Sequence, residues 1–512
     1  MTAHTPARPA RRWALPSILI PVLALLALLA WGFASPVGAG PDDDFHLSST
    51  WCGGTTSTEL CAPGSVDDER LVSPDLFSDA TCYAFDPLKS AGCQGADFGD
   101  DLTAGLTSSD RGNFAGLYPP VYYFVTSLFA GDNLETSALV MRALTSVLFV
   151  GLMTALYFLL PTRRRTTLIA SVAVTIVPLG MFLIPSNNPS GWAILSAATL
   201  WMALLGYFET SGIRRVLLAV LAVLATVIGA GARADSAIYA GIAIVAVLIL
   251  TARRGGDYLR LAILPVGLVA LALVGFFSAN QASAATSGLA GGAGAGYGAY
   301  ALIVNNLIQL PSLLTGAFGV WGLGWLDTAM PAIVQACAIG AVVGAVVLGL
   351  RARSRRKSLA ALFVAATVLA VPMYILYRSD AIVGSQVQPR YILPLIILFV
   401  GIVLLRPEGA APVFSRGTVL LIAGALSVAN AVALHANIRR YVTGTDVIGG
   451  NLDTDAEWWW NVPFSPMAVW FVGAAAFTAT VFWLAACWIT HARVADELLP
   501  EQVGRRDGIP AA

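Results

Sequence analysis

The chain has 512 residues, of which 57% are hydrophobic and only 12% are charged. Its mean hydropathy is +0.73. A water-soluble domain of this size has no room in one core for so much apolar surface, so the composition excludes a soluble globular protein. It predicts an all-α polytopic membrane protein, whose main partner is the lipid bilayer, and we expect no nucleic-acid partner.

Apolar runs near the length of a bilayer crossing follow one another along the chain. Two further apolar pieces, 118–130 and 301–320, are interrupted by Pro and Gly, and we interpret them as re-entrant or interfacial helices that do not cross. The predicted transmembrane helices are twelve: 14–34, 136–160, 167–185, 192–208, 216–232, 237–251, 261–279, 329–350, 358–377, 391–405, 417–435 and 466–490.

The basic residues set the predicted orientation. With both termini in the cytoplasm, 21 of the 30 Lys and Arg residues fall in cytoplasmic segments, as the positive-inside rule requires of a protein in the plasma membrane. The predicted parts are a cytoplasmic arm, a first transmembrane helix, an extracytoplasmic loop domain, a transmembrane bundle and a cytoplasmic tail: 1–13, 14–34, 35–117, 118–490 and 491–512.

Four of the six cysteines lie in the loop 35–117. An oxidising exterior permits two disulfides there. Of the three possible connectivities we favour Cys52 with Cys61 and Cys82 with Cys93. Loop staples are favoured over metal ligands because no His or Cys pair has a compact zinc spacing.

An acidic cluster follows the first predicted span, where Asp42, Asp43, Asp44 and His46 reach the external surface of the membrane. Closely spaced carboxylates repel one another and attract a cation or share a proton. The candidate catalytic roles are a general base toward an acceptor hydroxyl, or ligands for a divalent cation (Mg, Mn or Ca) held by Asp42 and Asp43. The alternative is a solvated helix cap.

Several short motifs, in order, resemble those of a bacterial multispan membrane-protein family of unknown function that is related to the GT-C glycosyltransferases. They cover residues 14 to about 405 and begin with the acidic motif, which is similar to the family's PD[DE]xxH. Tyr118 stands where that family has His, and Pro389 where it has Gly. The other matching segments are YPPVYY at 118–123, NPSG at 188–191, RAD at 233–235 and QPRYILP at 388–394.

The resemblance implies a GT-C-like bundle and an essential acidic residue in the first external loop. Asp43 is preferred over Asp42 because it occupies the acidic position of the family motif. The resemblance also implies a polyprenyl-phosphate-linked sugar as donor. The predicted substrate-binding residues are those of the matching motifs: Tyr122, Asn188, Asp235 and Tyr391.

Nine basic residues fall outside the cytoplasmic segments, and four of them lie in or beside predicted spans. An unpaired Arg in hydrocarbon costs at least ~2.5 kcal/mol. We therefore predict that these four bind the donor phosphate at headgroup level, and that Arg233 and Arg390 come together in space. Pairing within the membrane, for instance of Arg233 with Asp235, is the alternative. The four candidates are Arg142, Arg233, Arg378 and Arg390.

The leading hypothesis is a glycosyltransferase that moves a sugar from a polyprenyl phosphate to an envelope glycan or glycolipid on the outer face. Asp would accept the acceptor proton while Arg or a metal stabilises the leaving phosphate. A transporter of lipid-linked or polar solutes is the first alternative, although the charges crowd one face and no repeat relates the halves. A non-catalytic envelope assembly protein is the second.

Overall fold

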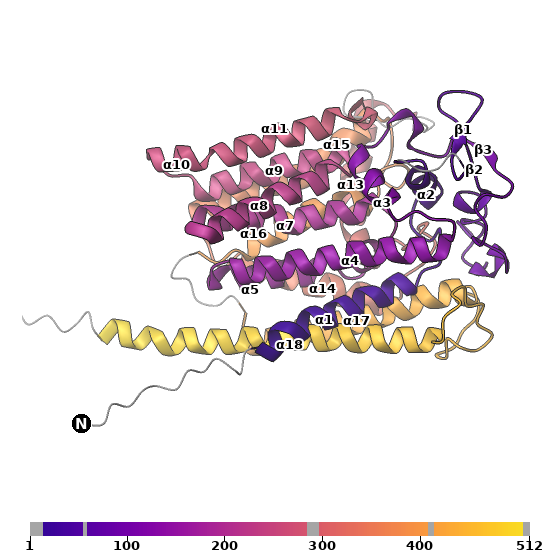
Figure 1. Cartoon of the computed structure of the whole chain (residues 1–512). Coiled ribbons are helices and arrows are strands. Elements are labelled where there is room, and N and C mark those ends of the chain that lie inside the picture. The colour runs from indigo at the N-terminus through magenta and orange to yellow at the C-terminus, as the bar shows by residue number, and fades with distance from the viewer. Residues whose placement is uncertain (1–13, 55–58, 284–295, 408–413, 505–512) are drawn as a thin grey trace, which may run out of the picture.

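The computed structural model describes residues 14–54, 59–283, 296–407 and 414–504. It is mainly helical, and the long helices lie side by side with their axes roughly aligned (Figure 1). Residues from the segment 35–117 cover one end of this bundle, which we call the loop end. The predicted arm 1–13 and the last eight residues of the predicted tail lie outside the described residues.

The helices of the bundle contain few charged residues, which is why they pack together and against lipid. Four of them begin with a side-chain cap, from Asn133, Asn188, Ser354 and Ser415. Their bounds are α1 Ala14–Phe33, α4 Leu134–Leu159, α5 Thr162–Thr175, α7 Pro189–Glu209, α8 Gly212–Ala230, α9 Ala234–Thr251, α11 Ile263–Phe277, α14 Ala332–Gly349, α15 Arg355–Arg378, α16 Pro389–Leu404, α17 Arg416–Val442 and α18 Pro466–Gly504.

Short elements connect the long helices or build the loop end. The helices among them are α2 Asp43–Trp51, α3 Pro120–Ser127, α6 Leu179–Leu183, α10 Gly256–Leu261 and α13 Ala299–Thr315. Single turns are η1 Pro74–Leu76, η2 Ala91–Gln94, η3 Asn113–Ala115, η4 Asn280–Ser283 and η5 Gly316–Val320. The strands are β1 Ala62–Pro63, β2 Arg70–Val72 and β3 Thr107–Ser109.

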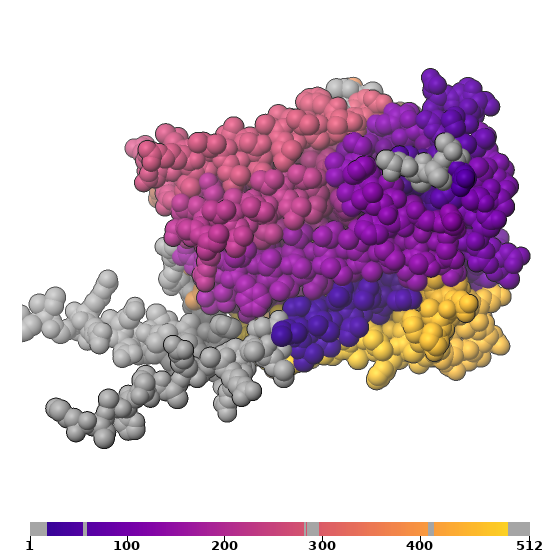
Figure 2. Space-filling view, in the orientation of Figure 1, coloured from indigo at the N-terminus to yellow at the C-terminus, as the bar shows by residue number. Residues whose placement is uncertain are grey.

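Ten helical segments of the described chain are long and apolar enough to cross a membrane. Nine of them coincide with predicted spans, and two more predicted spans correspond to the shorter apolar helices α1 and α16. A polytopic all-α membrane protein is therefore confirmed, while the count of twelve stays a prediction. Figure 2 shows α1 at the surface between α4 and α18, both of which it contacts.

The predicted span 167–185 is not one helix. It consists of the end of α5 and the short helix α6, and Pro178 lies between them. Proline cannot donate the backbone hydrogen bond that a continuous helix needs, so the chain breaks there. The prediction of a single helix was wrong because it followed the apolar run and gave no weight to Pro178 and Gly180 within it.

The two apolar pieces predicted not to cross, 118–130 and 301–320, form helices of different length, and both have residues at the loop end. Helix α3 has 8 residues, too few to span a bilayer. The segment 299–320 meets the length and composition of a span, yet it stays at the loop end. Asn306 donates to the carbonyl of Ala381, just after α15, and Gly316 lies against Pro389 at the start of α16.

The loop end has its own small core. Strands β1, β2 and β3 form an antiparallel sheet in that order, with Leu71 opposite both Ala62 and Ser108. Trp51, Leu76 and Leu102 are fully buried beside it. Both predicted disulfides are present, Cys52 with Cys61 and Cys82 with Cys93.

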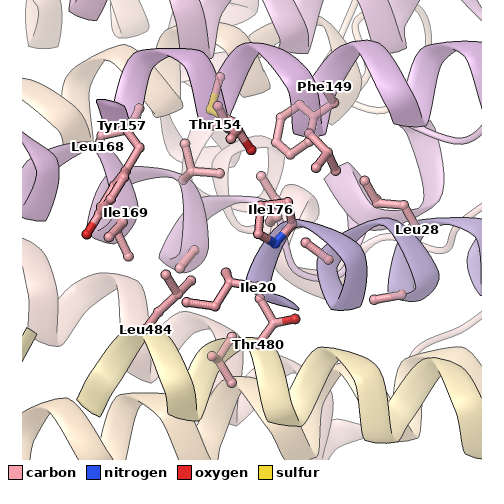
Figure 3. Close-up of a pocket in the computed structure, with 18 of the residues that line it drawn as sticks. Ile20, Leu28, Phe149, Thr154, Tyr157, Leu168, Ile169, Ile176, Thr480 and Leu484 are labelled. Carbon is pink, nitrogen blue, oxygen red and sulfur yellow. The ribbon is translucent and has the colours of Figure 1, made fainter. Parts of the chain in front are cut away.

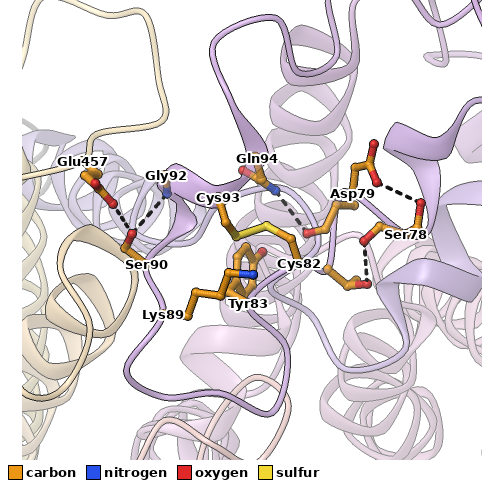
Figure 4. The surroundings of a disulfide bond; sticks show 12 residues. Ser78, Asp79, Cys82, Tyr83, Lys89, Ser90, Gly92, Cys93, Gln94 and Glu457 are labelled. Carbon is orange, nitrogen blue, oxygen red and sulfur yellow. Dashed lines mark hydrogen bonds between the residues drawn. A yellow bond between two sulfur atoms is a disulfide. The ribbon is translucent and has the colours of Figure 1, made fainter.

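The second disulfide holds a turn that is anchored to α17 and to the loop before α18. Arg440 of α17 donates to the carbonyls of Tyr83 and Lys89 inside this turn, at 2.8 and 2.6 Å, and pairs with Asp327. Figure 4 shows Ser90 of the turn beside Glu457, to which it donates a hydrogen bond. The disulfide turn therefore ties residues 35–117 to the bundle.

Candidate functional site

Asp42 is the residue that precedes the first turn of α2, and its backbone is in the left-handed region with φ of 61°. This conformation is uncommon outside glycine, and Asp is among the few residues that tolerate it. As a result the three consecutive carboxylates point in different directions. Asp42 faces α16, Asp43 turns back toward Gly40, and Asp44 faces Arg111.

Arg390, in the first turn of α16, forms an ion pair with Asp42. The same guanidinium donates to the carbonyl of Pro41 at 2.9 Å and to the hydroxyl of Tyr391 at 2.9 Å. Asn188 also donates to the Pro41 carbonyl, at 2.7 Å, while its own oxygen caps α7. The backbone before Asp42 is thus fixed from α7 and α16 together.

Arg233, which precedes α9, pairs with Asp235 through two hydrogen bonds of 2.9 and 2.8 Å. Its guanidinium lies 4.7 Å from the ring centre of Tyr391 and 5.6 Å from that of Tyr118. Arg390 lies 4.9 Å from the same Tyr391 ring. Arg233 and Arg390 therefore come together as predicted, and the predicted pairing with Asp235 is present as well.

The two arginines are buried, but their carboxylate partners reach the surface. The side chains of Arg233 and Arg390 are 4% and 3% exposed, whereas those of Asp235 and Asp42 are 25% and 37% exposed. A buried guanidinium is costly unless it is paired. Because its carboxylate partner is partly exposed, an anionic ligand can reach the pair and replace the carboxylate. We call Asp42, Arg233, Asp235, Arg390 and Tyr391 the paired-charge site.

Asp43 is buried, and it takes no part in either pair. Its Oδ2 accepts from the amide of Gly40 at 2.8 Å, so it closes the turn between α1 and α2. The sequence-based preference for Asp43 over Asp42 is therefore not what the geometry favours: Asp42 is the carboxylate that contacts Arg390 and solvent. The motif position alone carried no information about side-chain direction.

His46 is buried on α2 beside an aromatic group. Its Nδ1 lies 2.8 Å from the hydroxyl of Tyr123, and its ring contacts those of Phe45, Tyr118 and Tyr123. This places α2 against α3. Tyr122, a predicted substrate contact, packs in the core against Trp192 and is fully buried. Its role in the structure is therefore packing.

Two of the four arginines predicted to bind phosphate lie elsewhere. Arg142 is buried and donates to the carbonyls of Gly32, Ser35 and Pro36 and to Asn187, at 2.5–2.8 Å. Its guanidinium holds the end of α1, which is a structural role. Arg378 is the last residue of α15 and is exposed.

Burial and neighbouring charges shift the pKa values of Asp42, Asp43 and His46 in different directions. Burial raises the pKa of Asp43 to about 6. Burial also raises the pKa of Asp42, but the charge of Arg390 outweighs it and leaves that pKa below its usual value. Desolvation lowers the pKa of His46 to about 3, so this imidazole is neutral at pH 7. Asp42 is the charged group and His46 the uncharged one.

Several buried polar atoms of this region have no hydrogen-bond partner among the residues that the structure describes. They include Nε2 of His46, Nε of Arg390 and Oε1 of Gln388, the residue next to Pro389. Buried polar atoms are normally satisfied, so such a group indicates that water or a ligand completes it. All three belong to segments that contact the paired-charge site or adjoin it.

The residues present do not assemble a metal site around Asp42 and Asp43. The two carboxylates diverge, one toward Arg390 and the other toward Gly40. No group of three or more His, Cys, Asp or Glu side chains in the described part of the chain has the arrangement to hold a metal ion. A divalent cation stays a prediction, and no step below depends on one.

Sequence reasoning missed two contributors to the site. Tyr118 stacks on Arg233, and Arg111 forms an ion pair of 2.7 Å with Asp44 at the rim. Tyr118 belongs to the YPPVYY segment, so its motif was a usable signal. Arg111 had no such signal, because its only mark in the sequence is a positive charge in an acidic loop.

The apolar helices and the charged groups gathered at one end of them define a polytopic membrane protein with a buried ionic site. A family model described as a predicted membrane protein, DUF2142, matches residues 25–399, a stretch that contains the whole paired-charge site. The chain therefore belongs to the DUF2142 family, whose function is unknown. A comparison with curated proteins found no match.

Proposed function

We propose that the protein is a GT-C-like glycosyltransferase. It transfers a sugar from a polyprenyl phosphate to an envelope glycan or glycolipid, and the paired-charge site is its active site. The observation that carries the proposal is the convergence of Arg233 and Arg390 on Tyr391, with Asp42 paired to Arg390 and partly exposed. Two guanidiniums at the end of a helix bundle suit a phosphate at headgroup level.

The proposed orientation places the loop end outside the plasma membrane and both termini in the cytoplasm. Two observations support it. The loop end contains both disulfides, which persist in oxidising surroundings. The first turn of α5, at the opposite end, carries Arg163, Arg164 and Arg165, as the positive-inside rule expects on the cytoplasmic side.

The chemistry follows from the pairing. In the absence of substrate Asp42 occupies one amino group of the Arg390 guanidinium, so a donor phosphate that binds this amino group displaces the carboxylate. Asp42 then loses the charge that depresses its pKa and becomes a better base for the acceptor hydroxyl. The proton moves from the acceptor to Asp42, the acceptor oxygen bonds to the anomeric carbon, and the sugar–phosphate bond breaks.

The leaving group is the polyprenyl phosphate, whose additional negative charge the two arginines stabilise. Asp235 holds Arg233 in place, and the Tyr391 ring lies against both guanidiniums. Stabilisation by fixed charges in a site shielded from water is commonly the largest contribution to catalysis. The site therefore provides a base and two cations that hold the leaving phosphate, all from side chains of this chain.

A deletion strain tests this proposal in the cell. Expression of the wild-type chain should restore a sugar that is missing from the envelope and remove the polyprenyl-phosphate sugar that accumulates. Asp42→Asn and Arg390→Lys should restore neither, at normal abundance in the membrane. Asp100→Asn, an exposed carboxylate of the same loop, is the matched control and should behave as wild type. Full complementation by Asp42→Asn contradicts the proposal, and a solute-uptake defect without a glycan defect supports the transporter alternative.

A further inference from the structure

A cavity of about 410 Å³ lies among α1, α4, α5 and α18, away from the paired-charge site. Figure 3 shows side chains of these helices around it, with Ile20 and Leu28 from α1, Phe149 from α4, Ile169 from α5 and Leu484 from α18. The lining runs from Leu28 and Phe149 to Tyr157, near the end of α4, and Arg165, in the first turn of α5. That turn is at the end of the bundle opposite the loop end.

The lining is mainly apolar, and some of its polar groups are satisfied within their own helix. Thr480, for example, donates its hydroxyl to the carbonyl of Ala476 in its own helix. Close-packed proteins leave few voids larger than a water molecule. A cavity of this size and polarity is therefore suited to an apolar ligand, and the apolar molecules that surround these helices are lipids.

Arg165 supplies a charge at the rim of the cavity. Its contacts are long hydrogen bonds of 3.4 and 3.5 Å to the carbonyls of Leu160 and Phe158 and a position 5.0 Å from the ring centre of Tyr157. None of the ion pairs in the described part of the chain includes Arg165. Its neighbour Arg164, by contrast, has a bidentate pair with Glu209.

We propose that this cavity binds an anionic phospholipid, with an acyl chain between α1, α4, α5 and α18 and the headgroup phosphate at Arg165. The cation without a carboxylate partner gives charge complementarity with an anionic headgroup, since basic pockets between transmembrane helices recognise such lipids. Phe158, 45% exposed at the rim, lies where the chain enters from the bilayer.

The lipid is distinct from the proposed sugar donor. A donor held with its phosphate at Arg165 would be at the opposite end of the bundle from Asp42 and Arg390. The lipid site is therefore independent of the proposed function, and either can fail without the other.

Native mass spectrometry of the full chain tests the site. The protein is reconstituted in nanodiscs of equimolar dioleoyl phosphatidylglycerol and dioleoyl phosphatidylcholine, released into mild detergent, and weighed with its retained lipid. We expect the wild type to retain phosphatidylglycerol about fivefold over phosphatidylcholine, because the phosphatidylglycerol headgroup has a net negative charge, whereas choline neutralises the phosphate of phosphatidylcholine. Arg165→Gln should retain lipid without this preference. Arg214→Gln, an exposed arginine at the same end, should keep it.

Two filling variants, Ala24→Phe and Thr154→Phe, test the cavity itself, and Val147→Phe on the exposed face of α4 is their control. Each filling variant should lose the bound lipid while the control retains it. Circular dichroism identifies a variant that fails to fold, in which case the other decides. Equal retention of both lipids by the wild type, or undiminished retention by a folded filling variant, overturns the proposal.

Discussion

Arg390 of α16 forms an ion pair with Asp42, which lies 348 residues earlier in the chain. The pair joins the start of α16 to the turn after α1, and the same guanidinium holds the Pro41 carbonyl. Asp42 therefore serves the fold and the proposed chemistry through one contact.

A double-mutant cycle on Asp42→Ala and Arg390→Ala should show strong coupling. Removal of Asp42 leaves Arg390 buried without its carboxylate, and removal of Arg390 leaves Asp42 without its cation. Once one partner is gone, loss of the other should cost less, so the two effects on the free energy of unfolding should be non-additive by about 0.5–3 kcal/mol. Denaturant unfolding in detergent measures this. Additive effects would show that the contact is energetically silent.

Substitution of Arg142 should impair folding and leave catalysis intact, in contrast to substitution of Arg390. Because its donors satisfy three backbone carbonyls at the end of α1, Arg142→Ala leaves buried acceptors unpaired, each worth about 1–3 kcal/mol. Membrane abundance should fall sharply. Transfer activity per folded molecule should stay near wild type, which quantitative blotting alongside the activity assay will show. If the variant folded at normal abundance but lost activity, the original prediction that Arg142 binds the donor phosphate would be supported.

The disulfide turn provides a third prediction. Cys82→Ser with Cys93→Ser should lower the free energy of unfolding by about 2–3 kcal/mol, the value expected for a short loop. It also loosens the carbonyls that Arg440 binds. The unreduced protein should show a mass consistent with two disulfides by peptide mapping. Free thiols at Cys52, Cys61, Cys82 and Cys93 would contradict both the fold of the loop and its proposed exposure to an oxidising exterior.

The pH dependence of stability should contain two opposed contributions. His46 has its pKa lowered to about 3 by burial, so the unfolded chain, with a pKa of about 6.5, takes up the proton first and stability falls as pH drops below about 6.5. Asp43 has its pKa raised to about 6, so the folded chain takes up the proton first. Its contribution is present below about pH 4 and is lost as pH rises through 6.

Single variants should expose the two contributions between pH 6 and 4. Relative to wild type, Asp43→Asn should lose stability more steeply on acidification, and His46→Asn less steeply. The limiting slope for each group is about 1.4 kcal/mol per pH unit. Unfolding midpoints at several pH values measure the effect. Parallel curves for all three proteins would mean that neither group is buried as described.

Much of the architecture was predictable because lipid imposes simple demands on a sequence. Long apolar runs gave most of the helices, and crowding of cysteines in one loop gave both disulfides. Because an unpaired Arg is costly in an apolar environment, we could predict that Arg233 and Arg390 come together. The break at Pro178 depends on local backbone geometry, which hydropathy does not report.

The roles within the acidic cluster were not predictable. Three adjacent aspartates look equivalent in a sequence, but each has a different partner in the structure. Asp42, with a left-handed backbone, contacts Arg390, whereas Asp43 and Asp44 lie in the first turn of α2 and contact Gly40 and Arg111. Arg142 and Arg390 both lie beside apolar runs, yet one holds backbone carbonyls and the other a partly exposed carboxylate. Such assignments depend on contacts between residues hundreds of positions apart.

The most direct test of the proposed chemistry is release of polyprenyl phosphate by the purified protein. The chain is reconstituted in nanodiscs with polyprenyl-phosphate sugars extracted from the deletion strain and with its envelope glycan as acceptor, and free polyprenyl phosphate is followed by mass spectrometry. The wild type should release it with transfer of the sugar to the glycan. Asp42→Asn should do so at least about 100-fold more slowly per folded molecule. Equal rates for wild type and Asp42→Asn would contradict the account.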